Sequence, residues 1–236
     1  MWMAQGMDLG MTIYDVVATA DKVGMIEIVE QATTTAVIQK DAGGAMGAFK
    51  KKPLAKWIQA KNTSEKNYAQ ALDNFTRSCA AYSIATYVIG IGDRHNDNIM
   101  VTDEGYLFHI DFGHFLGHIM KFFFYNRESA PFVLTQEHVY VLGGEESERW
   151  RTYVNLCRKG YTVLRQHAHL FLSLFKMMLS TGIPQLQKVE DIFYLRDAFA
   201  LDKDNDEAED YFEELIYQSL ECKRTQVNFF VHNLAN

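Results

Sequence analysis

The segment from Gly90 to Gly113 constrains the fold of this chain more than any other stretch. It reads GIGDRHNDNIMVTDEGYLFHIDFG. Two short apolar runs, Ile99–Thr102 and Tyr106–Ile110, flank the loop Asp103–Gly105. A three-residue loop that contains glycine, set between two such runs, is typical of a β-hairpin.

The register of this hairpin brings two oxygen-bearing side chains to its open end. If Thr102 pairs with Tyr106, Asn98 lies opposite Ile110, immediately before Asp111. An amide oxygen and a carboxylate are the hard ligands that Mg²⁺ takes together with phosphate oxygens. The segment therefore predicts a nucleotide-bound metal held by Asn98 and Asp111. The same register places three apolar side chains on one face as a floor: Met100, Phe108 and Ile110.

The spacing of the polar residues resembles that of kinases. Protein kinases place a catalytic Asp and a metal-binding Asn as D-x-x-x-x-N, followed by Asp-Phe-Gly. Here Asp93 and Asn98 have that interval, and Asp111 begins Asp-Phe-Gly. The order Asp93-Arg94-His95, in place of His-Arg-Asp, resembles the phosphoinositide 3-kinase and 4-kinase superfamily. If this segment had only a structural role, core packing alone would have to account for both the Asp93–Asn98 spacing and the Asp-Phe-Gly triplet.

Composition sets the class of protein. The 236 residues are 48% hydrophobic and 22% charged, which indicates one globular unit, and the net charge of −7 argues against a nucleic-acid partner. Cys79, Cys157 and Cys222 are widely spaced and form no C-x-x-C motif, so we expect neither a disulfide framework nor a zinc site. No targeting sequence or membrane-length apolar run is present, and we expect a cytoplasmic protein.

The residues before the motif resemble the hinge between the two lobes of a kinase. Val23–Val29 and Thr35–Gln39 are typical of strands. Residues 22–35, KVGMIEIVEQATTT, resemble the hinge of class I phosphoinositide 3-kinases, closest to the gamma isoform. The resemblance implies an ATP site in which Glu27 and Val29 present backbone groups to adenine. The full set of expected ATP contacts is Tyr14, Ile26, Glu27, Ile28, Val29, Met100, Phe108 and Ile110. Each of the hinge residues could instead belong to an ordinary buried strand.

The other elements are expected to be helical, apart from a glycine-rich loop at Asp41–Gly47. A long helix is predicted over Glu65–Ile89 with Ser64 as its N-cap. One face of it carries the apolar stripe Leu72, Phe75, Cys79, Tyr82 and Thr86. Further helices are predicted at Leu54–Ala60, Ser147–Ser180, Lys188–Ala200, Asp204–Cys222 and Val227–Asn236.

The loop that chooses the lipid in this family corresponds to residues 111–135. Class I members carry a cluster of lysines there, whereas this chain has only Lys121 and Arg127 as firm cations, with His114 and His118 as conditional ones. Each phosphate carries about −1.5 to −2 charges near neutral pH, so two cations balance a bisphosphate headgroup poorly. The resemblance implies a phosphoinositide substrate contacted by Lys121 and Arg127, with the preferred lipid left open.

We therefore predict an α+β fold, a mostly helical protein-kinase-like C-terminal lobe with a catalytic hairpin and hinge strands. Residues 1–40 would be the end of the N-lobe and the hinge, and residues 41–236 the C-lobe, with the catalytic loop at 90–98 and the activation loop at 111–135. The chain contains neither a phosphate-covering glycine loop nor a strand lysine for the nucleotide phosphates. We interpret it as a piece of a larger enzyme, with most of the N-lobe missing and no activity expected of the piece alone.

The function implied by the resemblance is transfer of the ATP γ-phosphate to the inositol 3-hydroxyl, with Mg²⁺ as the metal. Asn98 and Asp111 would bind the metal, and either Asp93 or His95 would steer or deprotonate the hydroxyl. Expected partners are phosphoinositide lipids at the plasma membrane, a regulatory subunit, and Ras or G-protein subunits. The alternatives are a related Ser/Thr protein kinase, a phosphoinositide 4-kinase, or a lobe that serves only as an interaction module.

Overall fold

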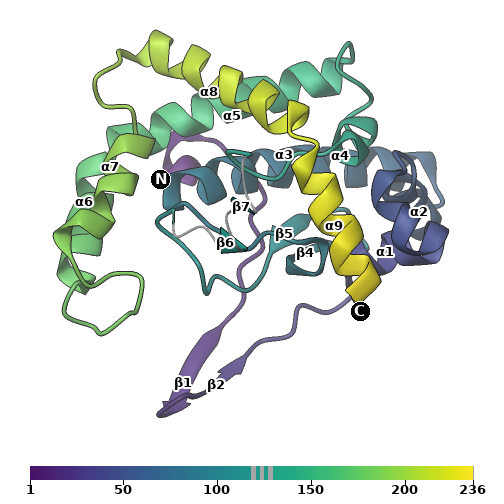
Figure 1. Cartoon of the computed structure of the whole chain (residues 1–236). Helices are drawn as coiled ribbons and strands as arrows, with labels where there is room; N and C mark the ends of the chain where they lie inside the picture. The colour runs from purple at the N-terminus through teal and green to yellow at the C-terminus, as the bar shows by residue number, and fades with distance from the viewer. Residues whose placement is uncertain (118–120, 123–124, 127–129, 236) are drawn as a thin grey trace.

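The computed structural model describes residues 1–117, 121–122, 125–126 and 130–235. Most of these residues are helical, as predicted, and three long helices form the frame: α3 (Glu65–Ile89), α5 (Glu148–Gln166) and α8 (Asn205–Glu221). Helix α5 packs between α3 and α8, and Figure 1 shows α5 and α8 running together along one side of the molecule. The core of the protein lies between these helices and a small sheet.

Helix α3 supports the catalytic loop, and its predicted bounds and cap are confirmed. The Ser64 hydroxyl accepts a hydrogen bond from the backbone N–H of Asn67 at 3.1 Å. The predicted stripe is buried throughout, with Phe75 completely inaccessible to solvent. The helix ends at Gly90, whose φ of 65° is a left-handed conformation that glycine adopts without strain. The chain leaves the helix there and enters the catalytic loop.

The predicted catalytic hairpin is also confirmed. Strands β4 (Ile99–Thr102) and β5 (Leu107–His109) are antiparallel, and Met100 pairs with Phe108. The backbone N–H of Ile110 donates to the carbonyl of Asn98 at 3.1 Å, which is the register that the loop length predicts. A third strand, β3 (Ala32–Thr34), pairs with β4 on its other side.

The predicted strand at Thr35–Gln39 is wrong. These residues begin helix α1 (Thr35–Gly43), and the Thr34 side chain caps it by accepting from the N–H of Val37 at 3.3 Å. The β-branched residues indicated a strand, but the N-cap and the packing of Ile38 into the core override that propensity.

The predicted loop at Asp41–Gly47 is wrong as well, because these residues complete α1 and enter the 3₁₀ helix η2 (Gly44–Phe49). Gly47 is required there by close packing: a Cβ at this position would lie 1.8 Å from the carbonyl oxygen of Gln39.

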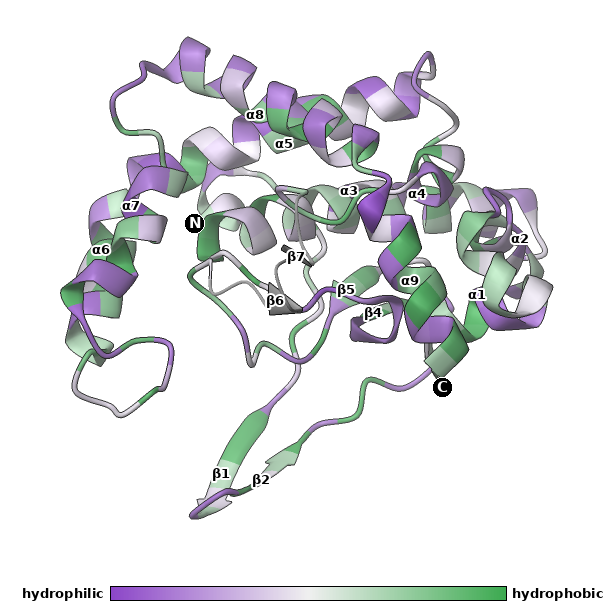
Figure 2. Cartoon of the chain, in the orientation of Figure 1, coloured by the Kyte–Doolittle hydropathy of each residue, from purple (hydrophilic) through white to green (hydrophobic). Residues whose placement is uncertain are grey.

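The predicted strand at Val23–Val29 is shorter than expected and has a partner that the sequence did not reveal. Strand β2 (Val23–Ile26) pairs with β1 (Val16–Ala20) in a two-stranded hairpin. Every residue of both strands is exposed. Figure 1 shows the hairpin projecting from the helical body, and Figure 2 shows that apolar residues make up much of it.

The remaining elements surround this frame. In chain order they are η1 (Trp2–Gln5), α2 (Pro53–Lys61), η3 (Asn96–Asn98), β6 (Lys121–Phe122), β7 (Tyr125–Asn126), α4 (Gln136–Val141), α6 (Ala168–Met178), η4 (Val189–Ile192), α7 (Phe193–Ala198) and α9 (Arg224–Ala235). The single helix predicted over Ser147–Ser180 is divided at His167 into α5 and α6. Helix α9 begins earlier than predicted and returns to pack against α1 and η2 (Figure 1). No helix in the described residues is both long and apolar enough to cross a bilayer.

Candidate active site

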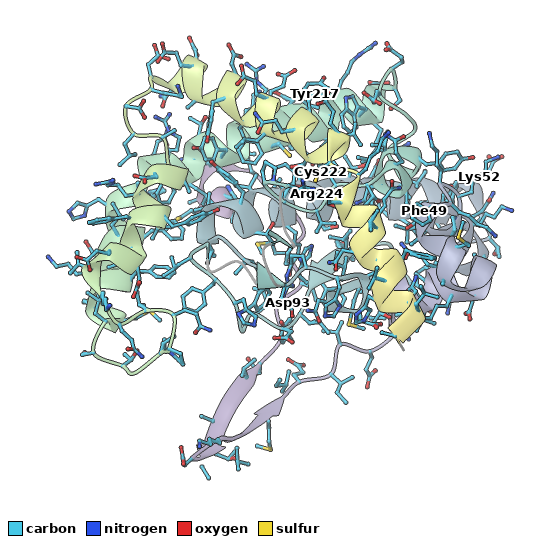
Figure 3. The ribbon with its side chains drawn as sticks, viewed as in Figure 1. Phe49, Lys52, Asp93, Tyr217, Cys222 and Arg224 are labelled. Carbon is cyan, nitrogen blue, oxygen red and sulfur yellow. The ribbon has the colours of Figure 1, made fainter. Side chains whose placement is uncertain are left out.

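The catalytic loop and the start of the activation loop are tied together by one buried arginine. The Arg94 side chain donates from Nε to the carbonyl of Gly92 and from Nη1 to that of Ile110, each at 2.8 Å. Its Nη2 donates to the carbonyl of Asp111. The carbonyl of Gly92 belongs to the catalytic loop, and those of Ile110 and Asp111 belong to the start of the activation loop. Arg94 therefore holds the two segments next to each other. Figure 3 shows Asp93 between the helical body and the projecting hairpin.

The two predicted metal ligands belong to the open end of the catalytic hairpin, where the backbone of Asn98 pairs with that of Ile110, next to Asp111. The Asn98 amide nitrogen donates to the carbonyl of Asp93 at 3.0 Å, which fixes the orientation of the amide. The Asp111 side chain is exposed and accepts from the N–H of Gly113 at 3.3 Å. Asp111 has a left-handed φ of 58°, an unfavourable backbone conformation for a residue with a Cβ. Such strain is concentrated at functional sites.

The chemistry of these two ligands fits a magnesium ion that is bound mainly through a nucleotide. An amide and a carboxylate supply hard oxygen donors. No group of three or more His, Cys, Asp or Glu side chains in the described part of the chain could hold a metal on its own. The remaining ligands would therefore come from phosphate oxygens and water, as is usual for Mg²⁺.

His95 is positioned in an unusual way for a polar side chain. Its ring stacks on the ring of His232, with 4.0 Å between centroids and 11° between planes. In the described part of the chain, its Nδ1 atom is buried without a hydrogen-bond partner. Burial, reinforced by His232, lowers the pKa of His95, although the nearby Asp93 opposes the shift. The lowered pKa favours the neutral imidazole, which is the form that accepts a proton.

Helix α9 supplies site residues that the sequence did not reveal. The His232 Nε2 atom lies 2.7 Å from Oδ2 of Asp97. Asn233 accepts from the Asn96 amide at 2.8 Å, and the Asn228 amide donates to the carbonyl of Arg94 at 3.3 Å. More than 130 positions separate the partners in each pair, and no local motif marks them.

A buried polar network supports the loop from behind. The amide of Asn96 donates to Gln39 at 2.8 Å, and the amide of Gln39 donates to Glu137 at 2.7 Å. Glu137 also accepts from the backbone N–H of Leu54 at 3.0 Å. Burial raises the pKa of Glu137 to about 7, even though both hydrogen bonds lower it.

The predicted ATP residues divide into two groups. Tyr14 reaches the catalytic hairpin, because its hydroxyl donates to the carbonyl of His109 at 3.4 Å and its ring lies 6.5 Å from that of Phe108. Met100 and Ile110 are half-buried, whereas Phe108 is completely buried and supports them from beneath.

Most of the predicted hinge contacts are exposed, while Val29 packs against the core. Ile26 and Ile28 are 66% and 84% exposed, Glu27 is also exposed, and Val29 is half-buried. The N–H of Glu27 donates to the carbonyl of Asp15 at 2.8 Å, which extends the β1–β2 pairing. Tyr14, Met100 and Ile110 therefore lie near the catalytic hairpin, whereas Ile26, Glu27 and Ile28 are exposed to solvent.

The side chains of both predicted lipid contacts lie outside the described parts of the chain. The backbone of Lys121 belongs to β6, but its side chain is not among the described parts of the chain. Arg127 and His118 lie outside the described residues altogether.

Comparisons with known proteins agree with the geometry of the motif. The family described as "Phosphatidylinositol 3- and 4-kinase" matches residues 1–188. Phosphatidylinositol 3-kinase 1 of Dictyostelium discoideum is 51% identical over 237 residues, covering 100% of this chain and 15% of the relative. Phosphatidylinositol 3-kinase 3 of the same organism is 50% identical over 236 residues, covering 100% of this chain and 14% of the relative.

A human relative extends the comparison beyond that organism. Phosphatidylinositol 4-phosphate 3-kinase C2 domain-containing subunit beta of Homo sapiens is 45% identical over 236 residues, covering 99% of this chain and 14% of that protein. The chain thus spans about one seventh of the length of these curated relatives. Since the family match covers well over half of the chain and includes the whole catalytic motif, the chain belongs to the phosphatidylinositol 3- and 4-kinase family.

Proposed function

We propose that this chain supplies the catalytic loop and metal-binding part of a phosphoinositide 3-kinase. The reaction is transfer of the γ-phosphate of ATP to the 3-hydroxyl of a phosphoinositide. The relatives at about half identity are named as 3-kinases, which favours a 3-kinase over a 4-kinase. Within the 3-kinases we propose class I, nearest the gamma isoform, on the resemblance of hinge residues 22–35.

One observation carries this proposal: Arg94 fastens the two halves of the motif to each other. Its bonds to the carbonyls of Ile110 and Asp111 bring the candidate metal ligands and the candidate base to the same end of one hairpin. Phosphoryl transfer depends mainly on positioning and on charge stabilisation. A rigid constellation of this kind meets that requirement.

Each side chain has a distinct role in the proposed mechanism. Asn98 and Asp111 would hold Mg²⁺, which would neutralise charge on the phosphate oxygens. His95, kept neutral by burial, accepts the proton from the attacking 3-hydroxyl. Asp93 orients that hydroxyl, and its backbone carbonyl anchors Asn98. Tyr14, Met100 and Ile110 lie against the nucleotide on the C-lobe side, while Ile26, Glu27, Ile28 and Val29 contact adenine from the hinge.

The proposed substrate and partners follow from the same assignment. The lipid headgroup is contacted by Lys121 and Arg127 of the activation loop, and the enzyme works in the cytoplasm until it is recruited to the plasma membrane. A regulatory subunit and Ras or G-protein subunits are its proposed partners in the full-length protein. The resemblance described for the sequence supports these assignments.

Asp111→Asn in the full-length enzyme tests the function. The substitution keeps the side-chain shape but removes the carboxylate charge, and we expect lipid-kinase kcat to fall by about 100-fold or more because phosphoryl transfer needs the metal. The thermal unfolding midpoint should not change, since Asp111 is exposed. The matched control is Asp103→Asn, on the far loop of the same hairpin. Activity above a tenth of wild type in Asp111→Asn would refute the metal assignment.

A further inference from the structure

The last helix of the chain contacts the catalytic loop at consecutive residues. Asn228 bonds to the carbonyl of Arg94, the His232 ring stacks on His95, and Asn233 bonds to Asn96. Such contacts do more than cover the loop, because each one fixes a separate backbone or side-chain group. Helix α9 is therefore part of the structure that shapes the loop.

Asp97 connects this helix to the other side of the loop. Its Oδ1 atom accepts from the hydroxyl of Thr34 at 3.0 Å, and its Oδ2 atom lies 2.7 Å from Nε2 of His232. A carboxyl bonded on both oxygens in this way is fixed in place and supports the His232 ring.

The His95 ring, by contrast, depends on stacking for its orientation. Its Nδ1 is buried without a hydrogen bond in the described part of the chain, so no bond at that atom sets the plane of the ring. The His232 ring lies nearly parallel to it at 4.0 Å. Rotation of His95 about its χ2 angle would break this contact.

We propose that His232 is a positioning residue that holds the imidazole of His95 in the plane required to accept the proton of the lipid hydroxyl. This inference rests on the proposed function, in which His95 is the base. Asp97 holds His232, His232 holds His95, and His95 presents its reactive edge to the substrate. A misplaced base loses much of its effect, because proton transfer requires hydrogen-bond geometry.

Two substitutions at His232 separate stacking from hydrogen bonding. His232→Phe retains an aromatic ring but cannot bond to Asp97, whereas His232→Gln can bond to Asp97 but cannot stack. We expect kcat to fall by roughly 10-fold to 100-fold in His232→Gln, because misplacement of about 1 Å has effects of this size. In His232→Phe kcat should stay within about 3-fold of wild type. The KM for ATP should be unchanged in both, since His232 is not among the proposed ATP contacts.

The assay uses the full-length enzyme with a soluble short-chain phosphoinositide, so that any change in membrane binding by α9 does not affect the rate. Val231→Ala is the matched control, because Val231 is on the same helix and is 49% exposed. It should leave kcat unchanged. Thermal unfolding of each variant shows whether the lobe remains folded. Equal kcat in wild type and His232→Gln, or equal losses in the Gln and Phe variants, would overturn the positioning role.

His95→Ala distinguishes failure of this inference from failure of the proposed function. If His95→Ala retains wild-type kcat, His95 is not the base, and both statements are wrong. If His95→Ala is inactive while His232→Gln is fully active, only the positioning role is wrong. In the expected case, adding His232→Gln to His95→Ala lowers kcat no further, because the two side chains act as one unit.

Discussion

Apolar residues are buried in the helical body and exposed to solvent in the β1–β2 hairpin. In the body, Phe75 of α3 and Tyr153 of α5 are completely buried. In the hairpin, Val16, Val17 and Met25 are 65%, 51% and 63% exposed. Hydrophobic residues occur in both regions, so their presence alone does not separate the two (Figure 2). Only the packing around them differs.

This difference divides the proposed active site in the same way. Asp93, His95, Asn98 and Asp111 are held by the body, through Arg94 and helix α9. Of the adenine contacts proposed for the hinge, Ile26, Glu27 and Ile28 are exposed, whereas Val29 is half-buried. The proposed catalytic and metal-binding residues are thus held by the body, and most of the proposed hinge contacts are not.

Phe75→Ala should have the largest effect of the changes that test this difference between body and hairpin. Removing a fully buried phenylalanine leaves a cavity, and we expect the free energy of unfolding of the chain to fall by about 3–5 kcal/mol. The matched substitution Val17→Ala, in the hairpin, should change it by less than about 0.5 kcal/mol, because surface positions seldom contribute more. Urea denaturation followed by circular dichroism measures both. Similar losses in the two variants would show that the hairpin is also part of the cooperative core.

A smaller effect is expected from the pH dependence of Glu137 in the body. The pKa of this carboxyl is about 7 in the folded chain, against an ordinary value of 4.5. Below about pH 4.5 the group is protonated in both states, and between 4.5 and 7 the folded state binds more protons than the unfolded state. The contribution of Glu137 to stability therefore falls as pH rises through this window, by up to about 3 kcal/mol.

Glu137→Gln removes this titration and tests it. The loss of stability between pH 4.5 and 7 should be smaller in Glu137→Gln than in wild type. The control Glu104→Gln, at an exposed position of the hairpin loop, should keep the wild-type slope. A Glu137→Gln variant with an unchanged slope would mean that Glu137 titrates normally. Denaturation at several pH values provides the comparison.

The smallest effect is expected for ATP binding by the chain alone. Because the proposed adenine contacts Ile26 and Ile28 are exposed, we expect no binding tighter than about 1 mM, which corresponds to about −4 kcal/mol. Isothermal titration calorimetry with Mg²⁺ and ATP measures it, with the full-length enzyme as the positive control. Micromolar affinity of the chain alone for ATP would show that the hinge binds the nucleotide without the rest of the enzyme.

Local patterns predicted the elements whose stabilising contacts lie close together in sequence. The N-cap of α3 at Ser64 and the register of the catalytic hairpin both depend on residues a few positions apart. The Asp93, Asn98 and Asp111 spacing was informative for the same reason. Thr35–Gln39 shows the limit of this reasoning, because β-branched residues indicated a strand where burial of Ile38 and capping by Thr34 make a helix.

The sequence by itself determined the family, the catalytic hairpin and the identity of the candidate metal ligands, since each is encoded in one continuous segment. Only the tertiary structure revealed that His232 stacks on His95 and bonds to Asp97. It also revealed that Ile26, Glu27 and Ile28 are exposed and that Arg94 bonds the catalytic loop to the start of the activation loop. These features depend on packing between segments far apart in the chain. Such long-range contacts produce no periodicity or spacing in the local sequence from which they could be predicted.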